Sequence, residues 1–492
     1  MKCLFSCGLL LVIAAPPVVA EEFVLHHEHV LGTSLELRVE APSRELAAAA
    51  ERCALDTIDR LDQTLSEYRS DSEFSRWRAG RLRQDELSEE LKQVMAAAEF
   101  WRLRSRGAFE PRVEELTCLW KNAAAESRIP TSLERREAVD RIQSDADGVR
   151  LSFNGLAKGF IIDEVCDVIR EQCPKVTGLV VNIGGDIRRT GSSPVKLVVA
   201  DPRDATVNAA PLAVVDSREP LALATSGGYR RGFQIQGHHY SHLIDPRTGL
   251  PQSMVLSASV VAASAIDADA AATALSIMGP QEGMALVESM DGVDCLLVTQ
   301  SGILTSTNWP GELGQDEGAG KKAPAAGKDS GLLVEFTLNR PKSRRRYRRL
   351  YVAVWLEDVD GFPVKTAVLW IQTEQPGPRW HRDLTRWYRN DRLRLLVEKK
   401  KMIGTVSGAT RGPGDYKARF DGTDNTGKQL KPGKYTLCIE AAREHGTYQI
   451  IRKSVSIGGD PIERTELKGN TEVSRAAFKW VPVESKETKP KQ

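Results

Sequence analysis

The stretch LSFNGLAKGFIIDEV, residues 151–165, changes its pattern in the middle. It begins as a short β-type run, turns through Asn154-Gly155, and continues with apolar residues at helical spacing. A glycine-bearing turn between a strand and a helix leaves backbone groups open to a phosphate or a metal, and Lys158 could meet an anion there. A plain strand–turn–helix without a ligand fits the same residues. The stretch therefore predicts a fold that mixes helices and strands.

The residues on both sides of this stretch continue the alternation of helices and strands. Apolar residues at helical spacing predict long amphipathic helices in three segments: residues 43–68, 87–105 and 158–172. Short β-type runs predict strands in GLVVNIGGDI, VKLVVAD, LALATSG, SASVVAAS and CLLVTQ. Residues 23–310 are therefore predicted to form one mixed α/β (α+β) domain of an enzyme-like kind.

The last third of the chain differs in composition and contains no alternation of predicted helices and strands. Residues 311–331, GELGQDEGAGKKAPAAGKDSG, contain almost nothing large and apolar and predict a flexible linker. Residues 332–465 contain strand-like runs such as LLVEFTLN, VKTAVLWIQT and YTLCIEAARE, separated by turn signals. They predict an all-β, sandwich-like domain. The polar residues 466–492 are predicted to be a disordered tail.

The N-terminus predicts export. Residues 1–20 place Lys2 before a short apolar run that ends at Pro16-Pro17, followed by small residues before Glu21. This arrangement is typical of a cleaved secretory signal peptide, and a bacterial periplasmic location follows. No later apolar run is long enough to predict a transmembrane span in the mature protein. The net charge of the 492-residue chain is +2, so nucleic acid is not expected as a main partner.

The cysteines leave two interpretations open. An exported protein can form disulfides, yet none of the spacings is typical of a metal site. Cys166 and Cys173 are close in sequence, but the sequence does not show that they pair. Buried apolar thiols are the alternative. The cysteines that remain after the signal peptide are Cys53, Cys118, Cys166, Cys173, Cys295 and Cys438.

Three further segments contain candidate functional residues. VVNIGGDIRRTG (180–191) has a Gly-Gly that would let the backbone approach a ligand, or simply make a turn. Many hydroxyl, glycine and histidine residues occur together in residues 223–251, LATSGGYRRGFQIQGHHYSHLIDPRTGLP. Among the histidines, His242 is the preferred candidate for a functional role. A surface histidine without such a role is the alternative. In AIDADAAATALSIMG (265–279), Asp269 and Thr273 share a helix face and offer hard oxygens that suit Mg²⁺. A helix-capping role is the alternative for such an Asp.

Taken together and in order, these motifs resemble the ApbE family, the FAD:protein FMN transferases. The segments that carry the resemblance are LGTSLEL, LSEYRSDSEFSRW, GAFE, NGLAKGFIID, NIGGDI, ATSGGYRRGF, SHLIDPRTGLP and IDADAAATAL. They cover about residues 23–310. The later β-region resembles an uncharacterised exported domain that is sometimes fused to such enzymes, and part of it resembles an Ig-like module.

The resemblance implies an activity and a set of site residues. Family members transfer the FMN part of FAD to a Thr or Ser hydroxyl of an exported protein, with Mg²⁺, and release AMP. Metal ligands would be Asp269, Thr273 and the carbonyl of Gly155, with Asp269 and His242 as catalytic residues and His242 as the general base. The implied flavin contacts are Leu31, Tyr68, Ala108, Phe109, Glu110, Ser152, Lys158, Ser226 and Leu243.

Some implied contacts depart from the family pattern. The family often has Met where this chain has Leu31, and Asp where it has Glu110 and Ser152. The metal pair Asp269 and Thr273 is intact. We interpret these differences as altered flavin contacts in a divergent branch.

TVSGATRGPG, residues 405–414, resembles an acceptor site for such an enzyme. Acceptor proteins carry roughly Asp-x-x-Ser/Thr-Gly-Ala-Ser/Thr, and here Ser407-Gly408-Ala409-Thr410 matches while Gly404 replaces the Asp. The chain could therefore flavinylate its own Thr410, or act on a separate exported protein with this motif. A surface turn is the structural alternative.

Other functions fit the same motifs. A Mg²⁺-dependent FAD pyrophosphatase would release FMN and AMP with water in place of the acceptor. A flavin-carrying periplasmic electron-transfer protein would use its enzyme domain only on itself. A protein that binds FAD without catalysis is a third alternative.

Overall fold

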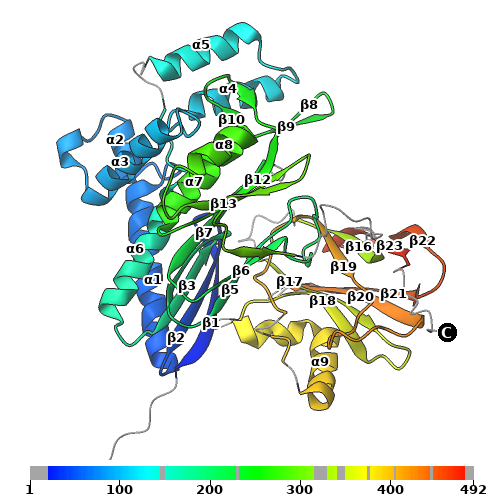
Figure 1. Cartoon of the computed structure of the whole chain (residues 1–492). Coiled ribbons are helices and arrows are strands. Elements are labelled where there is room, and N and C mark those ends of the chain that lie inside the picture. The colour runs from blue at the N-terminus through cyan, green and yellow to red at the C-terminus, as the bar shows by residue number, and fades with distance from the viewer. Residues whose placement is uncertain are drawn as a thin grey trace, which may run out of the picture.

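The computed structural model describes residues 20–144, 150–228, 232–314, 330–340, 349–373, 377–399, 401–403, 406–443 and 447–482. Two sheet-built parts follow one another along the chain, and Figure 1 shows them side by side. The predicted signal peptide up to residue 19 and residues 315–329 of the predicted linker lie outside the described residues. In the part of the chain that the structure describes, no helix is long and apolar enough to cross a membrane.

The first part is built on an eight-stranded sheet in which every neighbouring pair of strands is antiparallel. Its strands, in spatial order, are β1 (Glu21–Val30), β2 (Thr33–Ala41), β3 (Gly178–Ile183), β4 (Asp186–Gly191), β7 (Leu221–Ser226), β12 (Val255–Ala262), β13 (Asp294–Thr299) and β14 (Ile303–Thr305). The β-type runs predicted in this region therefore form strands, as expected.

Helices cover one face of this sheet, on the left in Figure 1. The helices that pack there through the largest apolar core are α1 (Arg44–Leu65), α3 (Glu89–Arg104), α6 (Ala157–Gln172) and α7 (Ala265–Ile277). The three predicted helices are confirmed as α1, α3 and α6. Helix α7 is buried on nearly every side, since it consists largely of alanine and packs against both the sheet and α6.

A small sheet covers the opposite face of the large one. It consists of β15 (Gly311–Leu313), β6 (Ala213–Ser217) and β5 (Val195–Val199). Apolar residues of β5 and β6 pack against Val180, Leu223 and Val298 of the large sheet. Strand β15 corrects the predicted linker, which was expected to start at Gly311, because these first residues pair with β6.

The remaining elements of the first part lie around these layers. They are α2 (Glu73–Arg78), η1 (Gln84–Glu86), α4 (Glu114–Ala125), α5 (Ser132–Gln143), β8 (Gly232–Ile235), β9 (His238–Ser241), β10 (Ile244–Asp245), β11 (Leu250–Pro251) and α8 (Pro280–Val287). A separate apolar cluster around Trp120 holds α4 and α5 to the β8–β9 hairpin.

The second part is a sandwich of two four-stranded sheets, as the sequence predicted. One sheet has the order β19 (Gly414–Phe420), β16 (Gly331–Leu338), β23 (Val473–Val481) and β22 (Ile462–Leu467), and the other β18 (Pro363–Trp370), β17 (Leu350–Glu357), β20 (Gly433–Arg443) and β21 (Tyr448–Ile457). Alternate residues of both sheets meet in one apolar core that includes Phe336, Val354 and Phe478.

The predicted disordered tail from residue 466 is wrong over most of its described length. Residues Val473–Val481 form β23, which lies in the middle of its sheet between β16 and β22. Phe478 and Trp480 are buried there. The alternation of apolar and polar residues in VSRAAFKWV is the strand signal, and the surrounding charged residues obscured it.

A helix that the sequence did not predict packs on the outer face of the sandwich. Helix α9 (Thr385–Glu398) follows the 3-10 helix η2 (Gly377–Asp383), and both cover the sheet that contains β17. The cap residue Leu384 has no capping side chain, and the Glu440 carboxylate of β20 accepts from the backbone N–H groups of Arg386 and Trp387 instead. Because β17 is covered on both faces, all its residues are buried.

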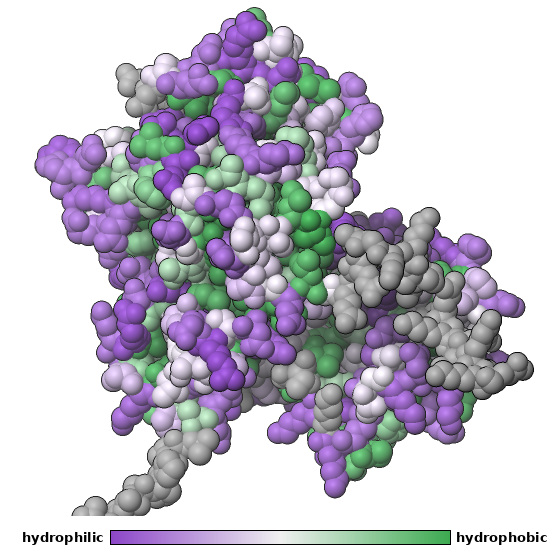
Figure 2. Space-filling view, viewed as in Figure 1, coloured by the Kyte–Doolittle hydropathy of each residue, from purple (hydrophilic) through white to green (hydrophobic). Residues whose placement is uncertain are grey.

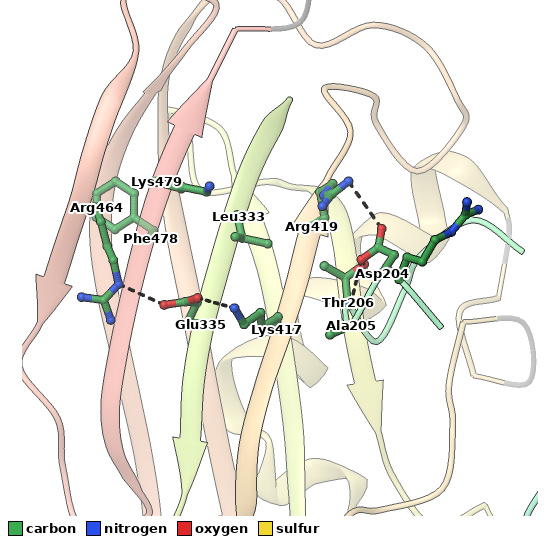
Figure 3. A pocket seen from close by; sticks show the side chains of 11 residues that line it. Asp204, Ala205, Thr206, Leu333, Glu335, Lys417, Arg419, Arg464, Phe478 and Lys479 are labelled. Atoms are coloured by element: carbon green, nitrogen blue, oxygen red, sulfur yellow. Dashed lines mark hydrogen bonds and ion pairs between the residues drawn. The ribbon is translucent and has the colours of Figure 1, made fainter. Parts of the chain in front are cut away.

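The two parts meet along two seams: one is formed by the loop after β5, and the other lies where Glu28 of β1 pairs with Arg349. The loop after β5 extends along the edge of β19, where Val207 N–H donates to the Lys417 carbonyl and Asn208 exchanges two hydrogen bonds with the Arg419 backbone. A cavity of about 300 Å³ lies beside this seam, lined mainly by charged side chains of the loop and the sheet (Figure 3). Figure 2 shows a mostly hydrophilic face, with apolar residues gathered near the junction of the two parts.

Candidate active site

The candidate site begins where α6 and α7 touch. Gly159 lies so close to α7 that an added Cβ would stand 2.3 Å from the carbonyl oxygen of Ala265, so only glycine fits. Asp163, one turn further along α6, accepts from the backbone N–H groups of Ala265 and Ile266 and thus caps the start of α7. These contacts fix the position of the helix that carries Asp269.

Asp269 and Thr273 occupy one face of α7, as their spacing predicted, and both face the loop before α6. The Gly159 N–H donates to Asp269 Oδ2 at 3.2 Å, and Thr273 Oγ1 lies 3.4 Å from the carbonyl oxygen of Gly155. A carboxylate, a hydroxyl and a backbone carbonyl therefore gather at one place. All three are hard oxygen donors, which fit a cation such as Mg²⁺.

The electrostatics of Asp269 favour a positive partner. Burial raises the pKa of its carboxyl, while the Lys158 ammonium and the hydrogen bond from Gly159 act in the opposite direction. Lys158 itself forms an ion pair with the buried Asp186 at the start of β4. One lysine faces two buried carboxylates, so one negative charge is not balanced and a further positive charge would be favourable in the site.

Asp186 joins this candidate site through its ion pair with Lys158, although the sequence did not indicate it as a candidate. It lies directly after the Gly184-Gly185 turn, which takes up two positive φ angles. A carboxylate that immediately follows a glycine pair at a strand start was the signal available in the sequence.

The residues around the Gly155 loop include several predicted flavin contacts. The ring of Phe109 reaches the loop, since an added Cβ at Gly155 would stand 3.0 Å from it. Asn154 donates to Tyr68 Oη at 3.3 Å and also to Glu67. Tyr68 is 85% exposed, which is unusual for so large an aromatic ring and leaves its face free for a ligand.

The segment Ala108–Glu110 packs against the start of the same loop. Ala108 and Phe109 are buried, and the backbone N–H of Ser152 donates to the carbonyl of Pro111 at 2.7 Å. Residues 151–153 form no strand, contrary to the expectation for the opening stretch, because this contact to Pro111 takes the place of a sheet partner. Glu110 forms an ion pair with Arg112 beside a second cavity of about 300 Å³.

The remaining predicted contacts come from other elements. Leu31 lies in the turn between β1 and β2 with φ of 47°, a left-handed conformation that is strained for leucine. Leu243 packs on the large apolar core, and its N–H donates to Ser241 Oγ. Ser226 ends β7, opposite Ala258. His242 follows β9 and is half-buried.

The structure does not place Thr410 at this site. Thr410 is only 3% exposed, and among the described residues its buried hydroxyl has no hydrogen-bond partner. Its backbone is held on both sides, because its N–H donates to the Glu28 carboxylate and its carbonyl accepts from Arg349 at 3.0 Å. Thr410, the last residue of the matching motif, is therefore enclosed beside β1, while residues 407–409 are half-buried, and modification of Thr410 would require this segment to open.

The fold and this group of motifs define an ApbE-type protein. Residues 31–297, more than half of the chain, match the model of the ApbE family, and the chain belongs to this family. Residues 332–475 match a second family, described as a predicted periplasmic protein (DUF2271).

Named relatives share the first part of the chain. The FAD:protein FMN transferase of Vibrio cholerae is 30% identical over 254 residues, which are 47% of this chain and 74% of that protein. The FAD:protein FMN transferase of Treponema pallidum is 28% identical over 309 residues, 55% of this chain and 83% of that protein. The crystal structure of the ApbE protein from Thermotoga maritima matches with a TM-score of 0.51 and 26% identity, over 58% of this chain and 97% of that one.

Proposed function

We propose that this chain is a Mg²⁺-dependent FAD:protein FMN transferase that modifies a Ser or Thr hydroxyl of an exported protein. The observation that carries the proposal is the cluster of hard oxygens from Asp269, Thr273 and Gly155 on the loop-to-helix corner of an ApbE fold. The names of the relatives support the reaction class. An Asp, a hydroxyl and a carbonyl leave coordination positions for phosphate oxygens and water, as Mg²⁺ prefers.

The reaction breaks the phosphoanhydride bond between the two halves of FAD and forms a phosphoester bond to the acceptor. The acceptor hydroxyl oxygen bonds to the phosphorus of the FMN half of FAD, the bond from this phosphorus to the bridging oxygen breaks, and AMP leaves. The hydroxyl proton passes to a base, for which we propose His242. When bound, Mg²⁺ would neutralise charge that develops on the phosphate oxygens.

The protein's own residues would hold the substrate and the charges. Asp269 and Thr273 would bind the cation, and the rigid contact between α6 and α7 keeps them in place. Lys158 would face the phosphates while Asp186 fixes its position. The exposed ring of Tyr68 and the turn at Leu31 would bound the flavin.

We further propose that the enzyme works outside the cytoplasm on a separate acceptor. The predicted signal peptide of residues 1–20 and the description of the second family support export to the periplasm. The buried hydroxyl of Thr410 favours an acceptor in trans that carries a Ser/Thr-Gly-Ala-Ser/Thr motif.

The test measures the products of the reaction. The purified chain is incubated with FAD, Mg²⁺ and an acceptor protein of the stated motif, and intact masses and AMP are recorded. An FMN mass on the acceptor with an equal amount of AMP is expected. Free FMN and AMP without protein-bound flavin would identify a pyrophosphatase, and an FMN mass on the chain itself would identify self-modification.

A further inference from the structure

Two thiols face each other between α1 and the end of α6. Cys53 Sγ and Cys173 Sγ are 3.9 Å apart, and Cys53 also donates to Gln172 Oε1 at 3.4 Å. The first cysteine lies in the middle of α1 and the second is the C-cap residue of α6. The two residues are 120 positions apart in the sequence, so their contact is a product of the fold.

The other described cysteines have different surroundings. Cys166, Cys295 and Cys438 are buried, and burial raises the pKa of each thiol to about 12. Such thiols form little thiolate and react slowly with oxidants. Cys118 is half-buried and donates to Glu114, which together with burial raises its pKa. Cys53 and Cys173 are both half-buried, and each has another thiol beside it.

We propose that Cys53 and Cys173 form a structural disulfide when the chain meets a thiol oxidant, as it would in the exported compartment of the proposed function. The sulfurs are already in van der Waals contact, and a disulfide bond of about 2 Å requires a small approach of the two side chains. The two thiols give up two protons and two electrons, and the disulfide of the oxidant is reduced to two thiols.

The cross-link would stabilise the helix pair beneath the candidate site. Helix α6 is 16 residues, or roughly 24 Å, long. Cys173 lies at one end, while Lys158 and Gly159 at the other end face α7 and Asp269. The bond would close a long loop and so reduce the entropy of the unfolded chain, while the distant site residues stay where they are.

The experiment uses the chain from Glu21 onward, which has six cysteines, after complete reduction. It is oxidised with oxidised glutathione at mildly alkaline pH, because burial and the neighbouring Cys53 thiol raise the pKa of Cys173. We expect the intact mass to fall by two hydrogen atoms. Under denaturing, non-reducing conditions four thiols should react with maleimide, two fewer than the six of the reduced chain. Peptide mapping should recover a peptide pair that joins Cys53 to Cys173.

Matched variants complete the test. Cys173→Ser should abolish the loss of two hydrogens, whereas Cys118→Ser should retain it. Oxidation should raise the Tm by roughly 5 to 15 °C in the parent chain and in Cys118→Ser, but not in Cys173→Ser. Six reactive thiols, a stable glutathione adduct, or a different cysteine pair would each overturn the proposal. Flavin transfer by the reduced chain is measured separately, so failure of the disulfide and failure of the proposed function are distinguishable.

Discussion

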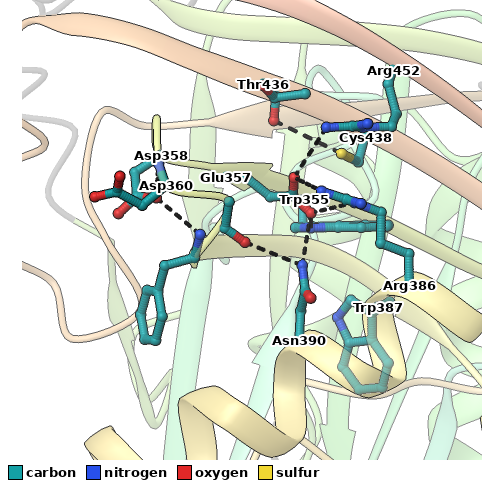
Figure 4. A network of polar contacts seen from close by, with 12 residues as sticks. Trp355, Glu357, Asp358, Asp360, Arg386, Trp387, Asn390, Thr436, Cys438 and Arg452 are labelled. Atoms are coloured by element: carbon teal, nitrogen blue, oxygen red, sulfur yellow. Dashed lines mark hydrogen bonds and ion pairs between the residues drawn. The ribbon is translucent and has the colours of Figure 1, made fainter.

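Both parts of the molecule contain buried carboxylates, and two of them, Glu357 and Asp269, have opposite surroundings. Glu357 in the sandwich is fully buried and accepts four hydrogen bonds, from Trp355, from two nitrogens of Arg386, and from Asn390 (Figure 4). Asp269 in the first part is 6% exposed and accepts from one backbone N–H at 3.2 Å. Burial raises the pKa of Asp269, since its charge is poorly compensated.

This difference distinguishes a carboxylate with a structural role from the carboxylate that we propose as a metal ligand. In the network around Glu357, protein donors satisfy both carboxylate oxygens, and the hydrogen bonds from α9 fix this helix to the sheet. Around Asp269, the Thr273 hydroxyl and the Gly155 carbonyl lie at the same corner between α6 and α7, and a bound cation would supply the missing positive charge. The comparison predicts that changes at the two positions affect different properties.

The largest expected effect is on activity at Asp269. Asp269→Asn keeps the shape of the side chain but removes the anionic ligand of the proposed metal. We expect flavin transfer to fall at least a thousandfold, about 4 kcal/mol in transition-state stabilisation. The Tm should stay close to that of the parent, because the Asn oxygen can still accept from Gly159. Transfer rates at saturating Mg²⁺ and thermal unfolding measure the two properties, and an active variant would refute the assignment.

Glu357→Gln is the matched control, because we expect it to lower stability while activity is retained. The neutral amide cannot balance the Arg386 guanidinium, whose side chain is 22% exposed and bound to both carboxylate oxygens. Removing one partner of a buried ion pair should lower the free energy of unfolding of the second part by about 3 kcal/mol. Urea unfolding followed by tryptophan fluorescence measures this loss. Flavin transfer to an acceptor should persist, and a large drop in transfer would show that the two parts are coupled.

The next effect is expected at the seam, where Glu28 lies between Arg349 and Thr410. Burial raises the pKa of Glu28 to about 7, against the pull of Arg349. A carboxyl whose folded pKa exceeds its unfolded value stabilises the fold fully below the unfolded pKa, and this contribution is lost as pH rises through the folded pKa. Stability should therefore decrease by about 3 kcal/mol from below pH 4.5 to above pH 7.

Glu28→Gln tests this pH dependence. The amide does not titrate, so the decrease between these pH values should become shallower by the same amount. Unfolding free energies of the parent and the variant at several pH values give the difference. Glu463→Gln, at an exposed position of β22, should leave the pH profile unchanged. Parallel profiles for the parent and Glu28→Gln would contradict the prediction.

The smallest effect is expected at Thr410. Thr410→Val preserves the shape and removes a buried hydroxyl that finds no hydrogen-bond partner in the part of the chain that the structure describes. Stability should rise by up to about 1 kcal/mol, and flavin transfer to a separate acceptor should stay within about twofold. Intact mass after incubation with FAD and Mg²⁺ is the decisive measurement. An FMN mass on the parent chain that is lost in Thr410→Val would show that the seam opens and that Thr410 is an acceptor.

Much of the fold could be predicted from local patterns. Apolar periodicity identified α1, α3 and α6, and β-type runs identified strands such as β3, β7 and β12 in the first part and β16, β18 and β20 in the second, because one face of these elements packs on a core. Helix α9 was missed, since its buried residues include Asn390 and Arg394 and it has no continuous apolar stripe. Strand β23 was missed because its alternation is short and lies in a charged context.

The sequence by itself determined the family motifs and the pairing of Asp269 with Thr273, since a spacing of four residues on a helix fixes a common face. Only the tertiary structure decided which charges meet: Lys158 with Asp186, Glu357 with Arg386, and Glu28 with Arg349. It also decided that Thr410, in a motif that resembles an acceptor, is enclosed. Burial and charge pairing depend on residues far apart in the chain, so no local pattern contains them.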